Sequence, residues 1–304
     1  MKKVYPTMIT PYTEDGRIDF DGVRRIVDWY AERGCHGIFA VCQSSEMQFL
    51  SLRERVALSR AVAAASAGRM HVVASGHCAE SIDEQAEEVN AMAETGVEAV
   101  VLVTNRLDLH NDGDDVWIRN AERLLAMIRP DIPLGIYECP NPYKRLLSEK
   151  LLRWCISTGR FRFIKDTCCD YETILERLKL LEGSGIELYN ANAQTLLPTM
   201  QCGAAGYSGV MANFHPELYV YLCENYEKEP EKAKLLASFL ELYAFTECMD
   251  YPVTAKYHMN LEGVPMGLFT RSRDPKELTA YQKMAVERGR TLENYFREQI
   301  GWRA

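Results

Sequence analysis

The sequence has no long hydrophobic run and no cluster of basic residues. A membrane-spanning helix needs roughly 18 or more consecutive apolar residues, and no stretch approaches that length. The formal net charge is −8 at pH 7 and the sequence pI is about 5.4. An acidic chain without basic patches is poorly suited to a nucleic-acid backbone or an anionic membrane, so we expect neither as a partner.

Signals for export and for structural zinc are also missing. Residues 1–6 contain neither the apolar segment nor the small-residue cleavage site of a secretory signal. The 10 cysteines include no Cys-x-x-Cys pair, which argues against a structural zinc site. Without an export signal, free thiols in a reducing compartment are favoured over disulfides. We therefore expect a cytoplasmic protein with buried thiols.

What the sequence does contain is a repeated alternation of short apolar strands and helices with capping signals. This alternation predicts parallel strands joined by right-handed crossovers. Eight strands favour a closed (β/α)8 TIM barrel over an open Rossmann sheet, which would need a glycine-rich turn after its first strand. We expect the strands at residues 4–10, 37–41, 71–75, 99–103, 133–137, 161–165, 186–190 and 205–210.

The chain is longer than a barrel requires, since that fold takes roughly 250 residues or fewer in its simplest forms. From residue 230 onward only helical periodicity is present, over residues 232–248, 253–261 and 275–296. No linker or low-complexity stretch separates this part from the rest. We expect a barrel over residues 1–226 and a C-terminal helical bundle over residues 227–304 that packs on it.

Lys165 is the most informative residue, because it ends the sixth expected strand. Barrel active sites lie at the carboxyl ends of the strands. A lysine at such a position is costly to bury unless it is paired or neutral, and burial lowers its pKa toward the range of a nucleophile. The alternative is a surface lysine, or one half of an ion pair with Asp166.

The other strand ends carry one tyrosine, several hydroxyls and amides, and few carboxylates. This set suits a ketone captured as an imine on Lys165, with the Tyr137 hydroxyl moving protons. Hydroxyl and backbone N–H groups at Ser44 and Ser45 would hold a carboxylate next to the ketone. Tyr137 could instead be packing, and the two serines could be turn residues.

Three other readings of the sequence remain open. A metal site would need converging ligands, but the six histidines are scattered and only His77 and His110 fall at the correct rim. Cys168 and Cys169 could be reactive thiols or packing residues. Glycines in the eighth repeat could form a phosphate loop, although we favour close approach of the backbone to a small substrate: Gly203, Gly206 and Gly209.

With Tyr137 and Lys165 on successive strands, the chain resembles the dihydrodipicolinate synthase and N-acetylneuraminate lyase family of pyruvate-dependent Schiff-base enzymes. The similarity spans essentially the whole chain. Its motifs are Thr10-Pro11 with Gly16-Arg17-Ile18-Asp19, Ser45-Glu46 with Leu50-Ser51 and Glu54-Arg55, Tyr137 with Pro140, Ile164-Lys165-Asp166, Gly206 with Ala212-Asn213, and Pro252-Val253 with Lys256.

The resemblance implies a role for each matching residue. Lys165 would form the imine and Tyr137 would be the proton shuttle, with no metal and no cofactor beyond the covalent imine. The remaining implied or expected substrate-binding residues are Gln43, Ser44, Ser45, Thr167, Asn192 and Ser208. The resemblance also implies a 2-keto acid substrate and an assembly of four identical chains, as a homotetramer or a dimer of dimers.

Several positions depart from dihydrodipicolinate synthases. Gln43 replaces a relay hydroxyl, Thr104-Asn105-Arg106-Leu107 lacks their tyrosines, and Pro142 stands where they have an arginine that grips a carboxylate. We therefore expect a lyase acting on pyruvate plus an aldehyde, or on a 2-keto sugar acid. The larger substrate would lie near Arg106, Glu138, Asn190 and Asn192. The alternatives are a true dihydrodipicolinate synthase and a non-catalytic barrel that binds a keto acid.

Overall fold

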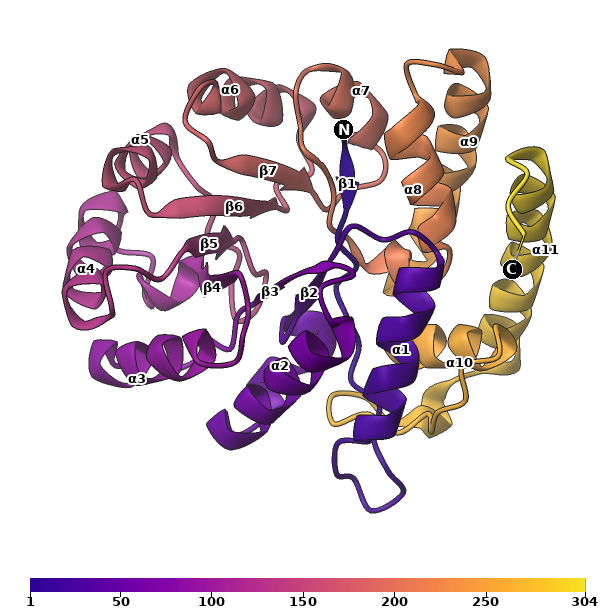
Figure 1. Ribbon diagram of the computed structural model, residues 1–304, viewed down its shortest axis with the longest axis horizontal. Coiled ribbons are helices and arrows are strands. Elements are labelled where there is room, and N and C mark those ends of the chain that lie inside the picture. The colour runs from indigo at the N-terminus through magenta and orange to yellow at the C-terminus, as the bar shows by residue number, and fades with distance from the viewer. Residues whose placement is uncertain (304) are drawn as a thin grey trace.

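The computed structural model describes residues 1–303, and a ring of eight parallel strands forms its centre (Figure 1). Neighbouring strands follow the order β1-β8-β7-β6-β5-β4-β3-β2. The strands are β1 (Lys3–Val4), β2 (Gly37–Ala40), β3 (His71–Ala74), β4 (Ala99–Val103), β5 (Leu134–Tyr137), β6 (Phe161–Asp166), β7 (Glu187–Asn190) and β8 (Gly206–Tyr207).

The segment just after β1 closes the ring against β2. The Phe39 N–H donates to the Pro6 carbonyl at 2.9 Å, and the Met8 N–H donates to the Phe39 carbonyl at 3.1 Å. Thr7 and Phe39 form a parallel bridge. The predicted (β/α)8 barrel is therefore confirmed.

The first and last strands are shorter than we predicted from residues 4–10 and 205–210. Pro6 has no N–H to donate, so the chain beyond Val4 makes isolated bridges instead of a continuous ladder. At the other end, Gly206 has φ +147°, and a Cβ there would lie 1.9 Å from the Lys3 carbonyl oxygen. Its close approach is to the backbone of β1 and not to a substrate.

Helices cover the outside of the ring (Figure 1). Side chains cap the first turns of several helices: Ser51 forms a capping box with Glu54, and Asp19 and Ser148 accept backbone N–H bonds. The helices are α1 (Phe20–Glu32), α2 (Leu52–Ser66), α3 (Ile82–Ala93), α4 (Asp114–Met127), α5 (Glu149–Thr158), α6 (Tyr171–Leu181), α7 (Leu196–Gln201) and α8 (Pro216–Asn225).

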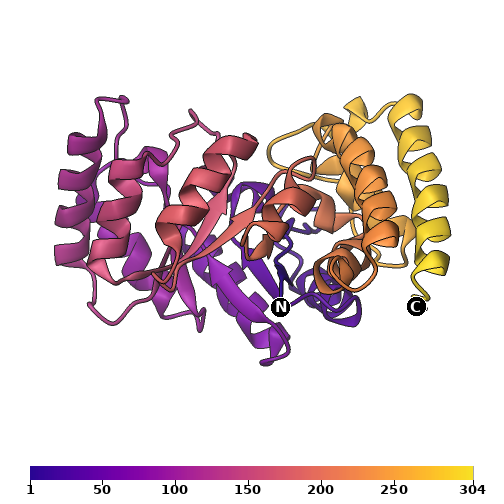
Figure 2. The same ribbon diagram turned by 90° about the horizontal axis from the view of Figure 1, so that it is seen from above.

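The rest of the described chain is helical and lies on one side of the barrel, beside α8 (Figures 1 and 2). It consists of α9 (Pro230–Tyr243), the short 3-10 helix η5 (Ala244–Cys248), α10 (Val253–Leu261), the 3-10 turn η6 (Pro275–Glu277) and α11 (Ala280–Gln299). We refer to it below as the appendage. The domain division at residue 226 stays a prediction.

A buried group of charges fastens α11 to the barrel. Glu293 is fully buried and accepts from His215 Nδ1 at 3.1 Å and from His258 Nε2 at 2.8 Å. Arg297 donates to Glu217 of α8 at 2.5 Å. Burial alone would raise the pKa of Glu293, but the two histidines hold it well below its usual range.

In the described part of the chain, residues 1–303, none of the helices combines the length and the apolar composition that a membrane span requires.

Candidate active site

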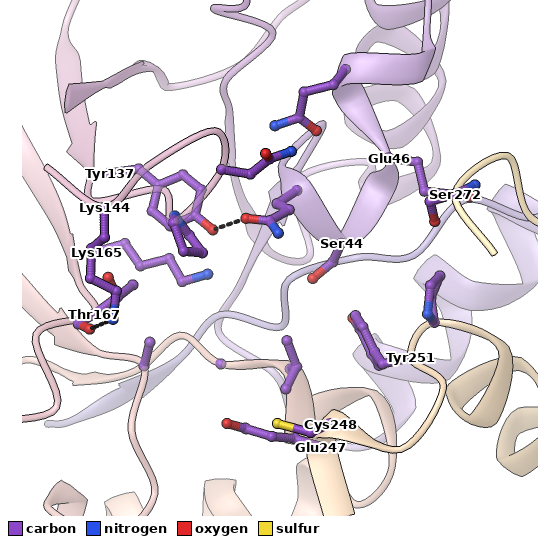
Figure 3. Close-up of a pocket in the computed structure, with 18 of the residues that line it drawn as sticks. Ser44, Glu46, Tyr137, Lys144, Lys165, Thr167, Glu247, Cys248, Tyr251 and Ser272 are labelled. Carbon is purple, nitrogen blue, oxygen red and sulfur yellow. Dashed lines mark hydrogen bonds between the residues drawn. The ribbon is translucent and has the colours of Figure 1, made fainter. Parts of the chain in front are cut away.

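A cavity of about 510 Å³ opens at the carboxyl ends of the strands, where barrel active sites lie (Figure 3). Its walls come from the segments that follow β2, β5, β6, β7 and β8. They also come from the appendage, through η5 and residues 251–252 and 272–273. The residues that line it include Gln43, Ser44, Gln48, Tyr137, Asn141, Lys144, Lys165, Thr167, Asn192, Gly209, Glu247, Cys248, Tyr251, Ser272 and Arg273.

Lys165 lies near the end of β6 and points its amine into this cavity (Figure 3). The side chain is buried, with only 4% of the residue exposed. Among residues 1–303, no carboxylate lies within salt-bridge distance of its Nζ. Burial lowers the pKa of Lys165, so at a given pH more of this amine is neutral than on an exposed lysine.

Tyr137 is held beside Lys165 by the register of the sheet. The two residues are direct partners in the β5–β6 ladder, and Lys165 Nζ lies 4.4 Å from the centroid of the Tyr137 ring. The ring also packs edge-on against Phe39, with centroids 5.5 Å apart. Burial raises the pKa of Tyr137 well above its usual value, so the phenol keeps its proton near neutral pH.

Gln43 begins a single 3-10 turn after β2, η1 (Gln43–Ser45). Two residues with left-handed backbone, Val41 at φ +47° and Glu46 at φ +60°, bracket this turn. Such angles are costly for residues other than glycine and often occur at functional sites. The Gln43 side-chain oxygen accepts from the Tyr137 hydroxyl at 3.5 Å and from Cys139 Sγ at 3.2 Å.

Ser44 faces the cavity and belongs to a chain of hydroxyl groups. Its hydroxyl donates to Thr7 Oγ1 at 3.1 Å. Tyr251 of the appendage lines the same wall, and its hydroxyl accepts from Asn213 Nδ2 at 3.1 Å. Ser44 therefore keeps its acceptor lone pairs, and Tyr251 keeps a proton to donate, at the floor of the cavity.

Thr167 and Asn192 also line the cavity, but their polar groups are already hydrogen-bonded. The Thr167 hydroxyl donates to the Glu138 carbonyl at 2.6 Å, and the Thr167 carbonyl accepts from Lys144 at 2.8 Å. The Asn192 side chain donates to Gln194 at 2.6 Å and accepts from Thr195 at 3.0 Å. The structure brings both residues to the site without leaving these groups free.

Ser45 and Ser208 lie outside the group of lining residues. The Ser45 hydroxyl donates to the Met8 carbonyl at 2.6 Å and accepts from the Cys42 N–H at 3.1 Å, so it stabilises the turn. The Ser208 side chain is fully buried, and its oxygen has no hydrogen-bond partner among residues 1–303. Of the eight predicted site residues, the structure gathers six around the cavity: Gln43, Ser44, Tyr137, Lys165, Thr167 and Asn192.

The expectation that Glu138 helps to hold the larger substrate is wrong. Glu138 is fully buried below the cavity, where it accepts from Arg177 at 2.8 Å and from the Thr167 N–H at 3.0 Å. Arg177 also pairs with Asp166, the residue next to Lys165. These three side chains form what we call the Arg177 cluster. The cluster stabilises the end of β6 from the side that faces away from the cavity.

Arg106 and Asn190 are likewise displaced from the cavity. Arg106 donates to the Asn105 side chain at 3.2 Å and to the Cys78 carbonyl at 3.2 Å, and it lines a separate, smaller hollow. Asn190 is fully buried and donates to Thr195 at 2.9 Å.

Sequence reasoning missed the contribution of the appendage. Glu247, Cys248 and Tyr251 reach the cavity from a part of the chain in which we recognised only helical periodicity. The one available signal was the family motif Pro252-Val253, which directly follows Tyr251. Lys144 was also missed, because its loop after β5 has no periodic pattern to place it.

The groups that could bind a metal lie elsewhere. His258, Glu262 and Glu293 offer ligand atoms within 4.8 Å of one another. Arginines already pair with Glu262, since Arg290 is 2.6 Å away and Arg297 is 3.0 Å away. This arrangement is a charge-balanced ion-pair cluster. His77 is buried and bonded to Gln85 at 2.8 Å, which explains why it is not available as a ligand.

A lysine amine and a tyrosine phenol, side by side at the carboxyl end of a (β/α)8 barrel, define a class of enzymes that bind carbonyl substrates as lysine imines. The model of the dihydrodipicolinate synthetase family matches residues 1–287. The chain belongs to this family, which confirms the resemblance seen in the sequence. Members are pyruvate-dependent lyases and synthases that use a lysine Schiff base, and this chain is an enzyme of that reaction class.

Individual relatives are distant but cover the chain well. The 4-hydroxy-tetrahydrodipicolinate synthase of Methanocaldococcus jannaschii is 26% identical over 271 residues, covering 88% of this chain and 90% of its own length. Among solved structures, a catalytic-lysine mutant of the Ruminococcus gnavus sialic acid aldolase has a TM-score of 0.87 at 18% identity, over 98% and 97% of the two chains. The 4-hydroxy-tetrahydrodipicolinate synthase of Methylacidiphilum fumariolicum SolV has a TM-score of 0.86 at 20% identity, over the full length of both.

Proposed function

We propose that this enzyme joins or splits pyruvate and an aldehyde, or dehydrates a 2-keto sugar acid, through an imine on Lys165. One observation carries this proposal. The Lys165 amine is buried, lacks a paired carboxylate in the described chain, and faces the cavity beside the Tyr137 phenol. An amine of lowered pKa in that position is suited to attack a ketone.

The neutral Lys165 amine attacks the ketone carbon, and water leaves to give the protonated imine. Loss of a proton from the neighbouring methyl group gives an enamine, whose carbon attacks the aldehyde. Addition of water to the imine then releases the product and restores the amine. The iminium serves as the electron sink in this sequence, so the chemistry requires no metal.

Tyr137 is placed to move the protons of these steps. Its phenol lies next to Lys165 and keeps its proton near neutral pH, so it acts first as an acid toward the leaving oxygen and then as a base. Ser44 gives its hydroxyl proton to Thr7, so the pyruvyl carboxylate beside it would accept from the Tyr251 hydroxyl and from backbone N–H groups near Ser44.

Trapping with borohydride tests the proposal directly. Incubation with pyruvate and sodium borohydride should reduce the imine and add the mass of pyruvic acid less one oxygen atom, located on Lys165 by peptide mapping. Lys165→Ala should lose both the label and turnover while keeping the parent's melting temperature. Lys144→Ala, which removes another lysine of the same cavity, should still be labelled. An unlabelled parent enzyme would instead support a non-catalytic keto-acid-binding barrel.

A second candidate is 4-hydroxy-tetrahydrodipicolinate synthase, which condenses pyruvate with aspartate semialdehyde. Relatives in sequence that carry this name, such as the enzyme of Methanocaldococcus jannaschii, favour it. Against it, Gln43 offers an amide where a relay hydroxyl is expected, and Pro142 cannot grip the aldehyde's carboxylate. Steady-state turnover of pyruvate with aspartate semialdehyde, compared with a panel of sugar-derived aldehydes and 2-keto sugar acids, separates the two.

We also propose that the enzyme is a homotetramer or dimer of dimers in the cytoplasm. The quaternary structure is supported by the family resemblance alone. The location is supported by the 10 free cysteines, some of them exposed, since exposed thiols persist in reducing compartments. Light scattering coupled to size-exclusion chromatography measures the assembly.

A further inference from the structure

Glu247 is an acidic side chain inside the cavity that the steps above do not use. It lies in η5 of the appendage and projects into the cavity on a different side of Lys165 from Ser44 (Figure 3). Its carboxylate makes no hydrogen bond or ion pair within residues 1–303. Burial raises the pKa of Glu247, and the Lys165 charge acts against that rise.

A carboxyl that faces a cavity and has no protein partner keeps its acceptor lone pairs for a donor on a ligand. Lys165 cannot be a permanent partner, because its nitrogen becomes part of the imine. The position of Glu247 relative to Ser44 indicates which part of the substrate supplies the donor. With the pyruvyl carboxylate at Ser44 and the ketone at Lys165, Glu247 faces the chain beyond the pyruvyl unit.

The charges of the cavity decide between kinds of donor. Glu247 needs a hydrogen-bond donor, which a carboxylate on that chain does not supply, and an ammonium group would be repelled by the protonated imine and by Lys144 and Arg273, which also line the cavity. A hydroxyl group meets neither penalty. The cavity lining also includes neutral amides and a hydroxyl, from Gln48, Asn141 and Ser272, and its volume of about 510 Å³ has room for more than a three-carbon acid.

We propose that Glu247 accepts hydrogen bonds from hydroxyl groups on the substrate chain beyond the pyruvyl unit, and so makes the enzyme selective for polyhydroxylated, sugar-derived chains. This inference rests on the proposed function and adds its substrate class. Glu247 is a specificity residue in this scheme, and Lys165 and Tyr137 retain the imine chemistry.

The test compares two aldehydes of equal carbon number, D-erythrose and butanal, each condensed with pyruvate. The parent enzyme should prefer erythrose. Glu247→Ala should raise the KM for erythrose roughly tenfold to a hundredfold, as expected for loss of a hydrogen bond to a charged group, and leave the KM for butanal unchanged. Glu247→Gln keeps an acceptor oxygen and should recover part of the loss.

Glu241→Ala is the matched control, because it removes the same charge from α9 and its side chain does not line the cavity. It should alter neither KM. An unchanged KM for erythrose in Glu247→Ala, or an equal rise for both aldehydes, would overturn the inference.

Borohydride trapping separates this inference from the proposed function. Normal pyruvate labelling of Glu247→Ala with altered selectivity supports both proposals. Loss of the label in Glu247→Ala alone would show a role in imine chemistry and contradict the specificity role. Absence of the label from the parent enzyme would refute the proposed function itself, and the inference would fall with it.

Discussion

Replacing Arg177 with leucine should destabilise the enzyme more than almost any other single change of charge. Arg177 has only 3% of its surface exposed and pairs with both Glu138 and Asp166, which are fully buried. Burial would lower the pKa of Arg177, but its two carboxylates raise it overall, so the guanidinium stays charged. Without it, two buried carboxylates face each other with no cation in the cluster.

Removing one partner from a buried ion pair costs about 3 to 5 kcal/mol. The Arg177 cluster is at the upper end of that range, because two carboxylates lose the same arginine. In a chain of this size roughly 2 °C of melting temperature corresponds to each kcal/mol, so Arg177→Leu should melt about 6 to 10 °C below the parent at pH 7.

The loss should also depend on pH. Burial, then the Asp166 charge, already raise the pKa of Glu138 against the effect of Arg177, and removing Arg177 raises it further. The folded variant then binds a proton that the unfolded chain releases above a pH of about 4.3. The free energy of unfolding of the variant must therefore fall as the pH rises from about 4.3 toward the raised pKa of Glu138. The loss of melting temperature relative to the parent should then be larger at pH 8 than at pH 5.

Differential scanning calorimetry at both pH values measures this deficit. Arg153→Leu is the control, since it breaks only an exposed pair with Glu149 at 2.7 Å, worth about 0 to 1 kcal/mol. A melting temperature of Arg177→Leu equal to that of the control, or a deficit that grows toward acid, would refute the reasoning about the cluster.

Two further predictions concern the shuttle and the attachment of α11. Tyr137→Phe should still be labelled by pyruvate and borohydride but turn over roughly 100-fold to 10,000-fold more slowly, and full activity in steady-state assays would show that the shuttle assignment is wrong. Glu293→Gln should lower the free energy of unfolding by about 2 to 3 kcal/mol, because the amide NH2 replaces one of the two carboxylate oxygens that accept from His215 and His258. Since the folded-state pKa of Glu293 is depressed, its contribution is complete above the unfolded pKa and is lost as pH falls, so thermal melts of parent and variant should converge in acid.

The sequence alone predicted the barrel and the position of its lysine, because both follow from local patterns. The strand before Lys165 alternates apolar residues, and the chain returns to a strand with the same period eight times. Once parallel order is accepted, Tyr137 and Lys165 must end neighbouring strands. The shortened strands at the two ends of the chain were less predictable, because they depend on how closely Gly206 approaches Lys3 in the closed ring.

Local sequence patterns could not predict which polar side chains face the cavity and which are hydrogen-bonded inside the fold. Glu138 and Thr167 both follow strand ends, but Arg177 of α6 draws Glu138 away from the cavity, and nothing in the local sequence marks that pairing. Ser45 and Ser44 are adjacent, and only the direction of a single 3-10 turn sends one hydroxyl to the cavity and the other to Met8. Glu247 is about 80 residues from Lys165 in the chain and meets it only because the appendage folds back over the barrel rim.

Barrel loops and the appendage line the same cavity, and this division has a consequence for how such enzymes diversify. The Lys165 amine and the Tyr137 phenol are positioned by the hydrogen-bonded ladder of two adjacent strands. Glu247 lies in the short 3-10 helix η5, which that ladder does not constrain. Grafting η5 from a relative with another preference should therefore exchange the accepted aldehyde and leave the reactivity toward pyruvate intact. Chemistry and selectivity would then be inherited through separate stretches of the same gene.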